Sequence, residues 1–242
     1  MSILITICAR GGSKGIPNKN LANLGNYPLL SYSAKAGKKF GEKYSADYGF
    51  STDRSEIRDL ASKYGFITDY ARPEFLATDS AGKIEAIYDL LIYEESRNKK
   101  KYDFVLDLDI TSPLRTVKDL EESFKILLSD ENAYNVFSVS KPHRNPYFNQ
   151  VEKDISGYFK LVKIPEIPIK SRQTAPKVWD LNASIYIYRR KFFDHGFQNA
   201  YTDKSLIYEM PHMCFDLDEK IDFEIMSYLI SNNKLDFEFD YL

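Results

Sequence analysis

Apolar positions follow two different periods along the first half of the chain. Apolar runs and two-residue alternation predict strands, and 3.6-residue spacing predicts helices. Strands are predicted at residues 3–7, 48–51, 66–70 and 104–110, the last with the strongest pattern. Helices are predicted at residues 28–40, 55–64, 83–97 and from 117 onward, behind a capping box at Thr116–Asp119. The repeated order of strand, loop and helix predicts an α/β fold, with a mostly parallel sheet and helices on both faces.

The pattern changes after Asn135. Strand-like segments without intervening helices follow at residues 136–140, 147–152 and 158–162, and then comes a long proline-containing connection at 163–178. Strands at 183–189 and 207–216 and a helix at 219–229 complete the chain. We therefore expect one α/β domain (residues 1–135 and 179–242) with a small β-rich insertion at 136–178. Long connections in compact domains are usually functional or contact a partner.

A glycine-rich loop, ARGGSKGIPNKN, follows the first predicted strand. It places Gly11, Gly12 and Gly15 among three cations, Arg10, Lys14 and Lys19. Glycines let a backbone approach a ligand closely, and peptide N–H groups in such turns bind phosphate. The loop therefore indicates an anion site, for which a nucleoside triphosphate is the obvious candidate. A turn with solvated charges remains the alternative, because the loop matches neither of the two common nucleotide-binding motifs.

Two pairs of aspartates lie on or at the end of predicted strands. Asp216 and Asp218 are two residues apart, so alternation puts both carboxylates on the same side of the strand. Such a pair suits Mg²⁺, which takes one or two carboxylates together with substrate phosphates. The alternative is that Asp218 caps the next helix. Asp107 and Asp109 form a second pair on the strongest predicted strand.

Other polar residues give weaker indications of function. Arg115 follows a predicted strand and either binds substrate oxygens or clamps the turn. The three histidines have no serine or reactive cysteine motif beside them, so the pattern gives no sign of nucleophilic catalysis.

Composition limits the classes of partner and location. The 242 residues are enough to bury a core without disulfides, and the net charge of −2 does not favour nucleic acid. Cys8 and Cys214 fit no metal-binding spacing and are expected to be buried free thiols of a reducing compartment. Neither a signal peptide nor a membrane-spanning run is visible, so we expect a cytoplasmic protein that binds no membrane.

Taken together, the loops resemble those of the CMP-nonulosonate (acylneuraminate-type) cytidylyltransferases over essentially the whole chain. Six motifs occur in the order of that family: ARGGSKGIPNKN, STD at 51–53, RPEFLATD at 72–79, TSPLR at 111–115, NASIY at 182–186 and DLD at 216–218.

The resemblance implies a Rossmann-like nucleotidyltransferase fold that binds CTP with Mg²⁺ or Mn²⁺. A sugar hydroxyl would attack the α-phosphorus of CTP and expel pyrophosphate. The implied catalytic residues are Arg10, Lys14, Lys19 and Asp216. Those implied around the nucleotide are Arg10, Gly12, Ser13, Asn20, Arg72, Asp79 and Lys83, with Asp216 and Asp218 as metal ligands. The family also pairs through its insertion, which implies a homodimer with residues 142–177 reaching toward the partner.

The resemblance implies a nine-carbon 2-keto sugar acid as the second substrate. Its implied contacts are Asp109, Ser112, Arg115, Arg172, Asn182 and Tyr186, with Arg172 facing the carboxylate. Asp109, Phe148 and Asp180 depart from the sialic-acid pattern, and the chain looks most like the legionaminic acid branch. The alternatives are a nucleotidyltransferase for 3-deoxy-manno-octulosonate or a hexose 1-phosphate, a glycosyltransferase, and a non-catalytic nucleotide-sugar binding protein.

Overall fold

A six-stranded sheet forms the centre of the computed structural model, which describes residues 1–12, 15–78 and 80–242. The strand order is β10-β6-β9-β5-β1-β4. The strands are β1 (Ile3–Cys8), β4 (Asp47–Ser51), β5 (Phe104–Leu108), β6 (Asn135–Ser140), β9 (Asp180–Arg189) and β10 (Ser205–Glu209). Only β9 runs antiparallel to its neighbours, β5 and β6. The predicted α/β fold with a mostly parallel sheet is confirmed.

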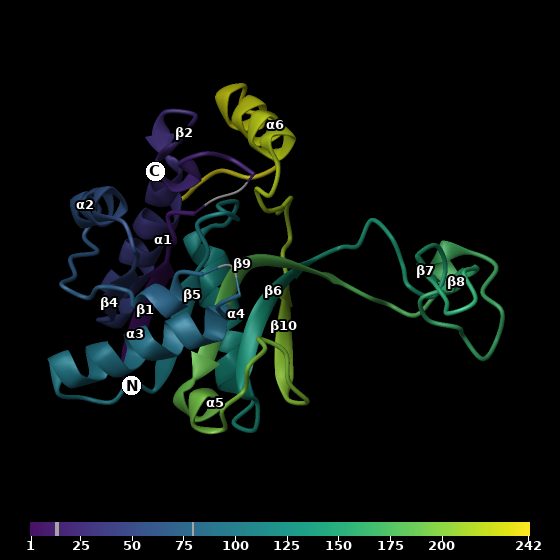
Figure 1. The fold of residues 1–242 in the computed structure, drawn as a ribbon, viewed down its shortest axis with the longest axis horizontal. Coiled ribbons are helices and arrows are strands. Elements are labelled where there is room, and N and C mark those ends of the chain that lie inside the picture. Colours follow the sequence, from purple (N-terminus) through teal and green to yellow (C-terminus); the bar gives the residue numbers. More distant parts are fainter. Residues whose placement is uncertain (13–14, 79) are drawn as a thin grey trace.

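Helices cover both faces of this sheet (Figure 1). The longer ones are α1 (Leu29–Tyr44), α2 (Ser55–Lys63), α3 (Lys83–Asn98), α4 (Val117–Ser129) and α6 (Lys220–Ser231). Shorter elements are α5 (Arg190–Asp194), η1 (Lys19–Leu21), η2 (Glu74–Leu76), η3 (Arg172–Thr174) and the paired strands β2 (Asn23–Leu24) and β3 (Tyr27–Pro28).

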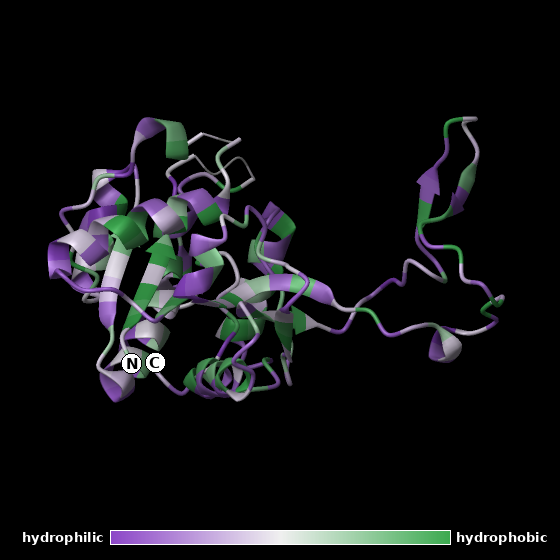
Figure 2. Ribbon diagram, turned by 90° about the horizontal axis from the view of Figure 1, so that it is seen from below, coloured by the Kyte–Doolittle hydropathy of each residue, from purple (hydrophilic) through white to green (hydrophobic). Residues whose placement is uncertain are grey.

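Alternation along the strands divides the core into two layers. Ile5 and Leu106 pack with the helices α1 and α4 on one face, whereas Leu4 and Val105 pack with α3 on the other. Successive side chains of a strand point to opposite faces, so a continuous apolar run serves both layers. Figure 2 shows apolar residues gathered along the strands of the sheet.

Several predicted strand positions are wrong. Residues 66–70 bury Phe66 and Tyr70 but pair with no strand of the sheet, so the apolar pattern there reports burial and not strand pairing. The strand predicted at 207–216 ends at Glu209, shortly before Pro211, which has no N–H to donate. The strand predicted to reach Ile110 ends at Leu108, because the carbonyl of Asp109 accepts hydrogen bonds from the Ser33 and Arg115 side chains instead.

The start of the insertion also needs correction. Residues 136–140 were expected to open it, but they belong to β6 inside the central sheet. The chain leaves the sheet after Ser140 and returns at Asp180, its register partner. The segment between them, residues 141–179, forms an arm that projects away from the body (Figures 1 and 2). A short hairpin of β7 (Val151–Lys153) and β8 (Phe159–Leu161) lies at its end.

The C-terminal segment after α6 ties several elements together. Asp240 accepts a hydrogen bond from the N–H of Val117 (2.9 Å), at the start of α4, and the ring of Phe237 stacks on His212. His212 lies 3.0 Å from a carboxylate oxygen of Asp119 and 3.0 Å from the carbonyl oxygen of Met213. Because both ring nitrogens face acceptors, the protonated imidazole fits this network best. Burial alone would lower the pKa of His212, but the hydrogen bonds to Asp119 and Met213 and the negative charges of Asp119 and Asp236 together outweigh burial and raise it.

This network predicts a pH-dependent contribution to stability. A raised folded-state pKa means that His212 stabilises the fold fully below its unfolded pKa of about 6.5 and loses this effect as pH rises through the folded pKa. His212→Gln should lower the free energy of unfolding by about 1–2 kcal/mol at pH 5.5 and by less at pH 9. Urea denaturation at both pH values measures this, with His143→Gln on the exposed arm as control. An equal loss at both pH values would contradict the charged network.

Candidate active site

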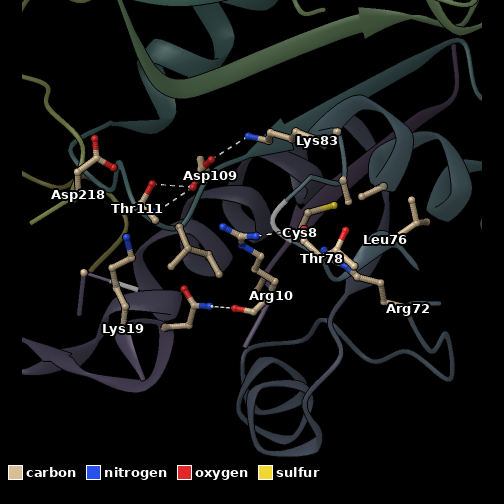
Figure 3. Close-up of a pocket in the computed structure, with 17 residues that line it drawn as sticks. Cys8, Arg10, Lys19, Arg72, Leu76, Thr78, Lys83, Asp109, Thr111 and Asp218 are labelled. Carbon is tan, nitrogen blue, oxygen red and sulfur yellow. Dashed lines mark hydrogen bonds and ion pairs between the residues drawn. The ribbon is translucent and has the colours of Figure 1, made fainter. Parts of the chain in front are cut away.

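A cavity of about 470 Å³ opens where the loops after β1 and β5 meet the segment that leads into α3. The carboxyl ends of parallel strands are the usual ligand-binding edge of such sheets. The cavity brings together most of the residues predicted for the nucleotide (Figure 3). Those that line it are Arg10, Lys19, Asn20, Arg72, Lys83 and Asp218, and Asp109, predicted for the sugar acid, lines it as well. Ser13, Lys14 and Asp79, also predicted there, lie outside the described residues, and Gly12 is exposed on the same loop.

Hydrogen bonds connect the glycine-rich loop to the neighbouring loops. The guanidinium of Arg10 donates to the carbonyl oxygen of Thr78 (3.2 Å), and the Asn20 amide donates to the carbonyl oxygen of Arg10 (3.0 Å). The N–H of Gly11 donates to the carboxylate of Asp53 (2.7 Å). Sequence patterns gave Asp53 and Thr78 no role, because their contacts join loops that are far apart along the chain.

The glycine-rich loop also contacts the DLD segment directly. A Cβ atom on Gly15 would lie 2.2 Å from the carbonyl oxygen of Asp218, so only glycine allows the two backbones to come this close. The ammonium of Lys19 donates to the carbonyl oxygen of Leu217 (2.5 Å). Cationic loop and acidic segment therefore border the same cavity.

Asp216 and Asp218 have the character of a cation site. Burial, and then the charge of Asp218, raise the pKa of Asp216, as expected for two nearby carboxylates without a cation between them. Asp218 does not cap α6, which the sequence left open. Instead, Glu219 is the capping residue, and the carboxylate of Asp222 accepts from the N–H groups of Asp218 and Glu219.

Two carboxylates supply only part of a coordination sphere. The described residues contain no group of three histidine, cysteine, aspartate or glutamate side chains placed to hold a metal. This donor set fits Mg²⁺, which characteristically completes its shell with water and substrate phosphates.

Lys83 lies between two carboxylates on the cavity wall. Its ammonium is 3.0 Å from Asp107, which is fully buried, and 2.9 Å from Asp109. Burial alone would lower the pKa of Lys83, but these two charges raise it well above its ordinary value. Burial would raise the pKa of Asp109, yet Lys83 and hydrogen bonds from Thr111 lower it to about 2. The ammonium also lies 4.5 Å from the ring centre of Tyr186, so its charge is already balanced within the protein.

Several predicted substrate contacts are instead structural in this fold. Arg115 is fully buried and donates to the hydroxyls of Ser33 and Ser184 (both 2.8 Å) and to two backbone carbonyls. Of the two roles that the sequence left open, the clamp is therefore the one observed. Ser112 is fully buried beside Cys214, and Asn182 is bonded to Ser138 and Ser140.

Two other predicted residues have distinct positions. Arg72 is nearly buried and donates to the hydroxyl (2.8 Å) and carbonyl (3.0 Å) of Ser51, which leaves its edge on the cavity. Arg172 is exposed on the arm, where it donates to the carbonyls of Pro142 and His143, away from the cavity-lining residues of its own chain.

Comparison with known proteins identifies the family. The cytidylyltransferase family model matches residues 4–235. The chain belongs to the cytidylyltransferase family. Post-translational flagellin modification protein B of Campylobacter coli is 36% identical over 233 residues, covering 96% of this chain and 97% of that protein. CMP-N,N'-diacetyllegionaminic acid synthase of Campylobacter jejuni is 35% identical with the same coverage. These findings confirm the family that the six motifs predicted.

A solved structure supports the fold. The structure of CMP:2-keto-3-deoxy-manno-octonic acid synthetase complexed with CTP aligns with a TM-score of 0.64 at 17% identity, covering 96% of this chain and all of that one. Among the described residues, no helix has the length and apolar character needed to cross a membrane.

The lysine between two aspartates gives a prediction. Lys83→Met would leave the buried Asp107 beside Asp109 without their shared cation, and we expect the free energy of unfolding to fall by about 2–3 kcal/mol. Lys83→Met/Asp107→Asn should recover part of this loss, because the neutral amide still accepts from Thr6. Urea denaturation measures both. Lys100→Met, which removes a surface ion pair with Asp47, is the control and should change stability little. An equal loss of stability in Lys83→Met and Lys100→Met would contradict a larger contribution from the buried ion pair.

Proposed function

We propose that this cytidylyltransferase transfers CMP from CTP to a nonulosonic acid of the sialic or legionaminic type and releases pyrophosphate. One observation carries the proposal: the cationic glycine-rich loop and Asp218 border one cavity, and Asp216 is close enough for the charge of Asp218 to raise its pKa. The substrate class is supported by relatives, among them the Campylobacter jejuni CMP-N,N'-diacetyllegionaminic acid synthase. CTP is a cytoplasmic metabolite, so we propose the same location for the enzyme.

In the proposed reaction, the anomeric hydroxyl of the acid loses its proton and its oxygen forms a bond to the α-phosphorus of CTP. The bond to the bridging oxygen breaks, and pyrophosphate leaves. Arg10, Lys14 and Lys19 would bind the triphosphate and oppose its negative charge, while Asn20 and Arg72 shape its pocket. Lys83 would help to position the nucleotide but would add little positive charge, because two carboxylates already neutralise it. Little covalent chemistry is required of the protein, so orientation and charge stabilisation supply the catalysis.

Asp216 and Asp218 would hold Mg²⁺ beside the triphosphate. When bound, this ion would neutralise phosphate charge and polarise the α-phosphoryl group. The segment that carries the pair contacts Lys19, whose ammonium donates to the carbonyl oxygen of Leu217 between the two aspartates.

The direct test is pyrophosphate release from CTP and Mg²⁺ across a panel of nonulosonic acids, with 3-deoxy-manno-octulosonate and a hexose 1-phosphate included. We expect release with at least one nonulosonic acid. Release only with 3-deoxy-manno-octulosonate or the hexose phosphate would favour those alternatives. CTP binding without release for any acid would favour a non-catalytic nucleotide-binding protein.

The acidic pair gives a prediction for turnover. Asp216→Asn should lower kcat by at least about 100-fold with the fold intact, because charge stabilisation of the transferring phosphoryl group depends on the bound cation. Steady-state pyrophosphate release at saturating CTP measures this, and circular dichroism checks the fold. Asp203→Asn, an exposed aspartate in the turn before β10, is the matched control. Near-normal turnover in the Asp216 variant would place the cation elsewhere.

We also propose that the protein is a homodimer that pairs through the arm at residues 141–179. A two-stranded hairpin alone is marginally stable in water. The arm nevertheless exposes large apolar side chains over much of its length, including Ile155, Tyr158, Phe159, Ile164 and Ile167. Contiguous exposed apolar surface marks an interaction site, and a second copy of the chain would cover it.

The geometry of the arm allows a clean deletion. Ser140 and Asp180 are register partners on adjacent antiparallel strands, so a two-residue Asn-Gly turn can replace residues 141–179. We expect this variant to be a monomer by light scattering, to bind CTP and to lose transfer to the acid. A dimer after deletion would show that the chains pair through another surface.

Arg172 gives the corresponding single-residue prediction. If it faces the carboxylate of the acid across the dimer, Arg172→Ala should raise KM for the acid about tenfold or more and leave KM for CTP nearly unchanged, since a charge-assisted pair contributes about 1.5–3 kcal/mol. Steady-state kinetics with each substrate varied measures this, with Lys170→Ala on the same exposed segment as control. Equal effects on the two KM values would reject the assigned role.

A further inference from the structure

Asp53, two residues beyond the carboxyl end of β4, contacts the glycine-rich loop at its start, whereas the DLD segment contacts it further along the chain. β1 and β4 are paired in parallel, and this pairing continues beyond both strands, where the N–H of Ala9 donates to the carbonyl oxygen of Ser51 (2.8 Å). Two residues further along each segment, the N–H of Gly11 donates to the carboxylate of Asp53 (2.7 Å). The strand pair thus continues into a contact between backbone and side chain at the start of the triphosphate loop.

The loop is held at its other end by a different contact. Gly15 packs against the carbonyl oxygen of Asp218, and Lys19 donates to that of Leu217. Residues 12–14 lie between the two contacts along the chain. Asp53 therefore fixes the end of the loop that the DLD segment does not reach.

A neighbouring side chain restricts Gly11 further. A Cβ atom on Gly11 would lie 2.3 Å from Cγ and 2.9 Å from Cδ of Arg54, so the stem of this arginine covers the glycine. A second cavity of about 200 Å³ behind the loop is lined by Gly11, Lys19 and Arg54 among others. The loop therefore packs against Arg54 at Gly11, and its residues Arg10 and Lys19 line the main cavity.

We propose that Asp53 is a positioning residue for CTP: its carboxylate holds the amide of Gly11 and so sets the conformation of the triphosphate loop. The inference rests on the proposed use of this loop for CTP. It assigns no contact between Asp53 and substrate. A carboxylate near a triphosphate is electrostatically unfavourable. What Asp53 supplies is therefore the hydrogen-bond acceptor, and its charge is not required.

This distinction makes two substitutions opposite in effect. Asp53→Asn keeps an acceptor oxygen for the Gly11 amide and removes the negative charge. It should bind CTP as tightly as the wild type or more tightly. Asp53→Ala removes the acceptor and should weaken CTP binding by up to about tenfold, since the loss of one hydrogen bond to an uncharged acceptor corresponds to at most about that factor. Asp53→Glu moves the acceptor by one methylene and should weaken binding several-fold in a protein of unchanged charge.

The experiment measures CTP affinity by isothermal titration calorimetry with Mg²⁺, and KM for CTP and for the acid by pyrophosphate release. We expect higher Kd and KM for CTP in the alanine and glutamate variants, an unchanged KM for the acid, and rescue by asparagine. Hydrogen exchange of the Gly11 amide should be faster in both weakened variants and normal in the asparagine variant. Asp59→Ala, on the exposed side of α2, is the control.

Several outcomes would overturn the inference. These are wild-type CTP affinity in Asp53→Ala or Asp53→Glu, equal weakening by asparagine and alanine, or a parallel loss for both substrates. If the alanine variant fails to fold, the glutamate and asparagine pair decides the question alone. CTP affinity is independent of turnover, so a wild-type protein that binds CTP but releases no pyrophosphate would refute the proposed function without deciding the role of Asp53.

Discussion

A fully buried guanidinium holds together the elements beneath the cavity. Arg115 donates to Ser33 on α1, to Ser184 on β9 and to the carbonyls of Asp109 and Ser112 in the loop after β5. No carboxylate accepts from it among these contacts, and burial lowers its pKa. Burying a charge in this way is unfavourable unless its donors are satisfied, so hydroxyl and carbonyl dipoles must stay in place around it. The floor of the cavity is therefore rigid where the strand β5 ends.

On this floor the charges are unevenly distributed. Lys83 is neutralised by Asp107 and Asp109, whereas the ammonium of Lys19 donates to the backbone carbonyl oxygen of Leu217. The cations of the glycine-rich loop thus lie next to the segment that carries Asp216 and Asp218. The proposed triphosphate and its cation would complement these two groups of charges.

The arm has a different physical character from the body. The body buries its apolar residues in two layers around the sheet, but the arm leaves most of its own exposed. Exposed apolar surface of this kind marks an interaction site, which is the basis of the proposed dimer. Arg172 lies on this arm and not beside the cavity of its own chain. The proposed contact between Arg172 and the acid therefore depends on the proposed dimer.

The sequence by itself determined the class of fold and the family. Periodicity identified β1 and β5, and the capping box at Thr116–Asp119 marked the start of α4, because these signals depend on neighbours along the chain. The order of six motifs predicted the family, which the comparisons confirm. From residue types alone, the glycine-rich loop indicated an anion site and the DLD segment a possible Mg²⁺ site, each with an alternative left open.

Only the tertiary structure decided which residues meet. Periodicity reports which side chains are apolar but not which strand pairs with which, so it could not place β9 antiparallel between β5 and β6 or assign residues 136–140 to the sheet. The structure shows that Arg115 is buried and acts as a clamp, a role that the sequence had left open. It also shows that two aspartates neutralise the charge of Lys83. The contact between Gly11 and Asp53 joins loops 42 positions apart, which depends on the parallel register of β1 and β4 and on nothing local. Distances between residues remote in sequence are set by the packing of the whole sheet, and the chemistry of this cavity depends on these distances.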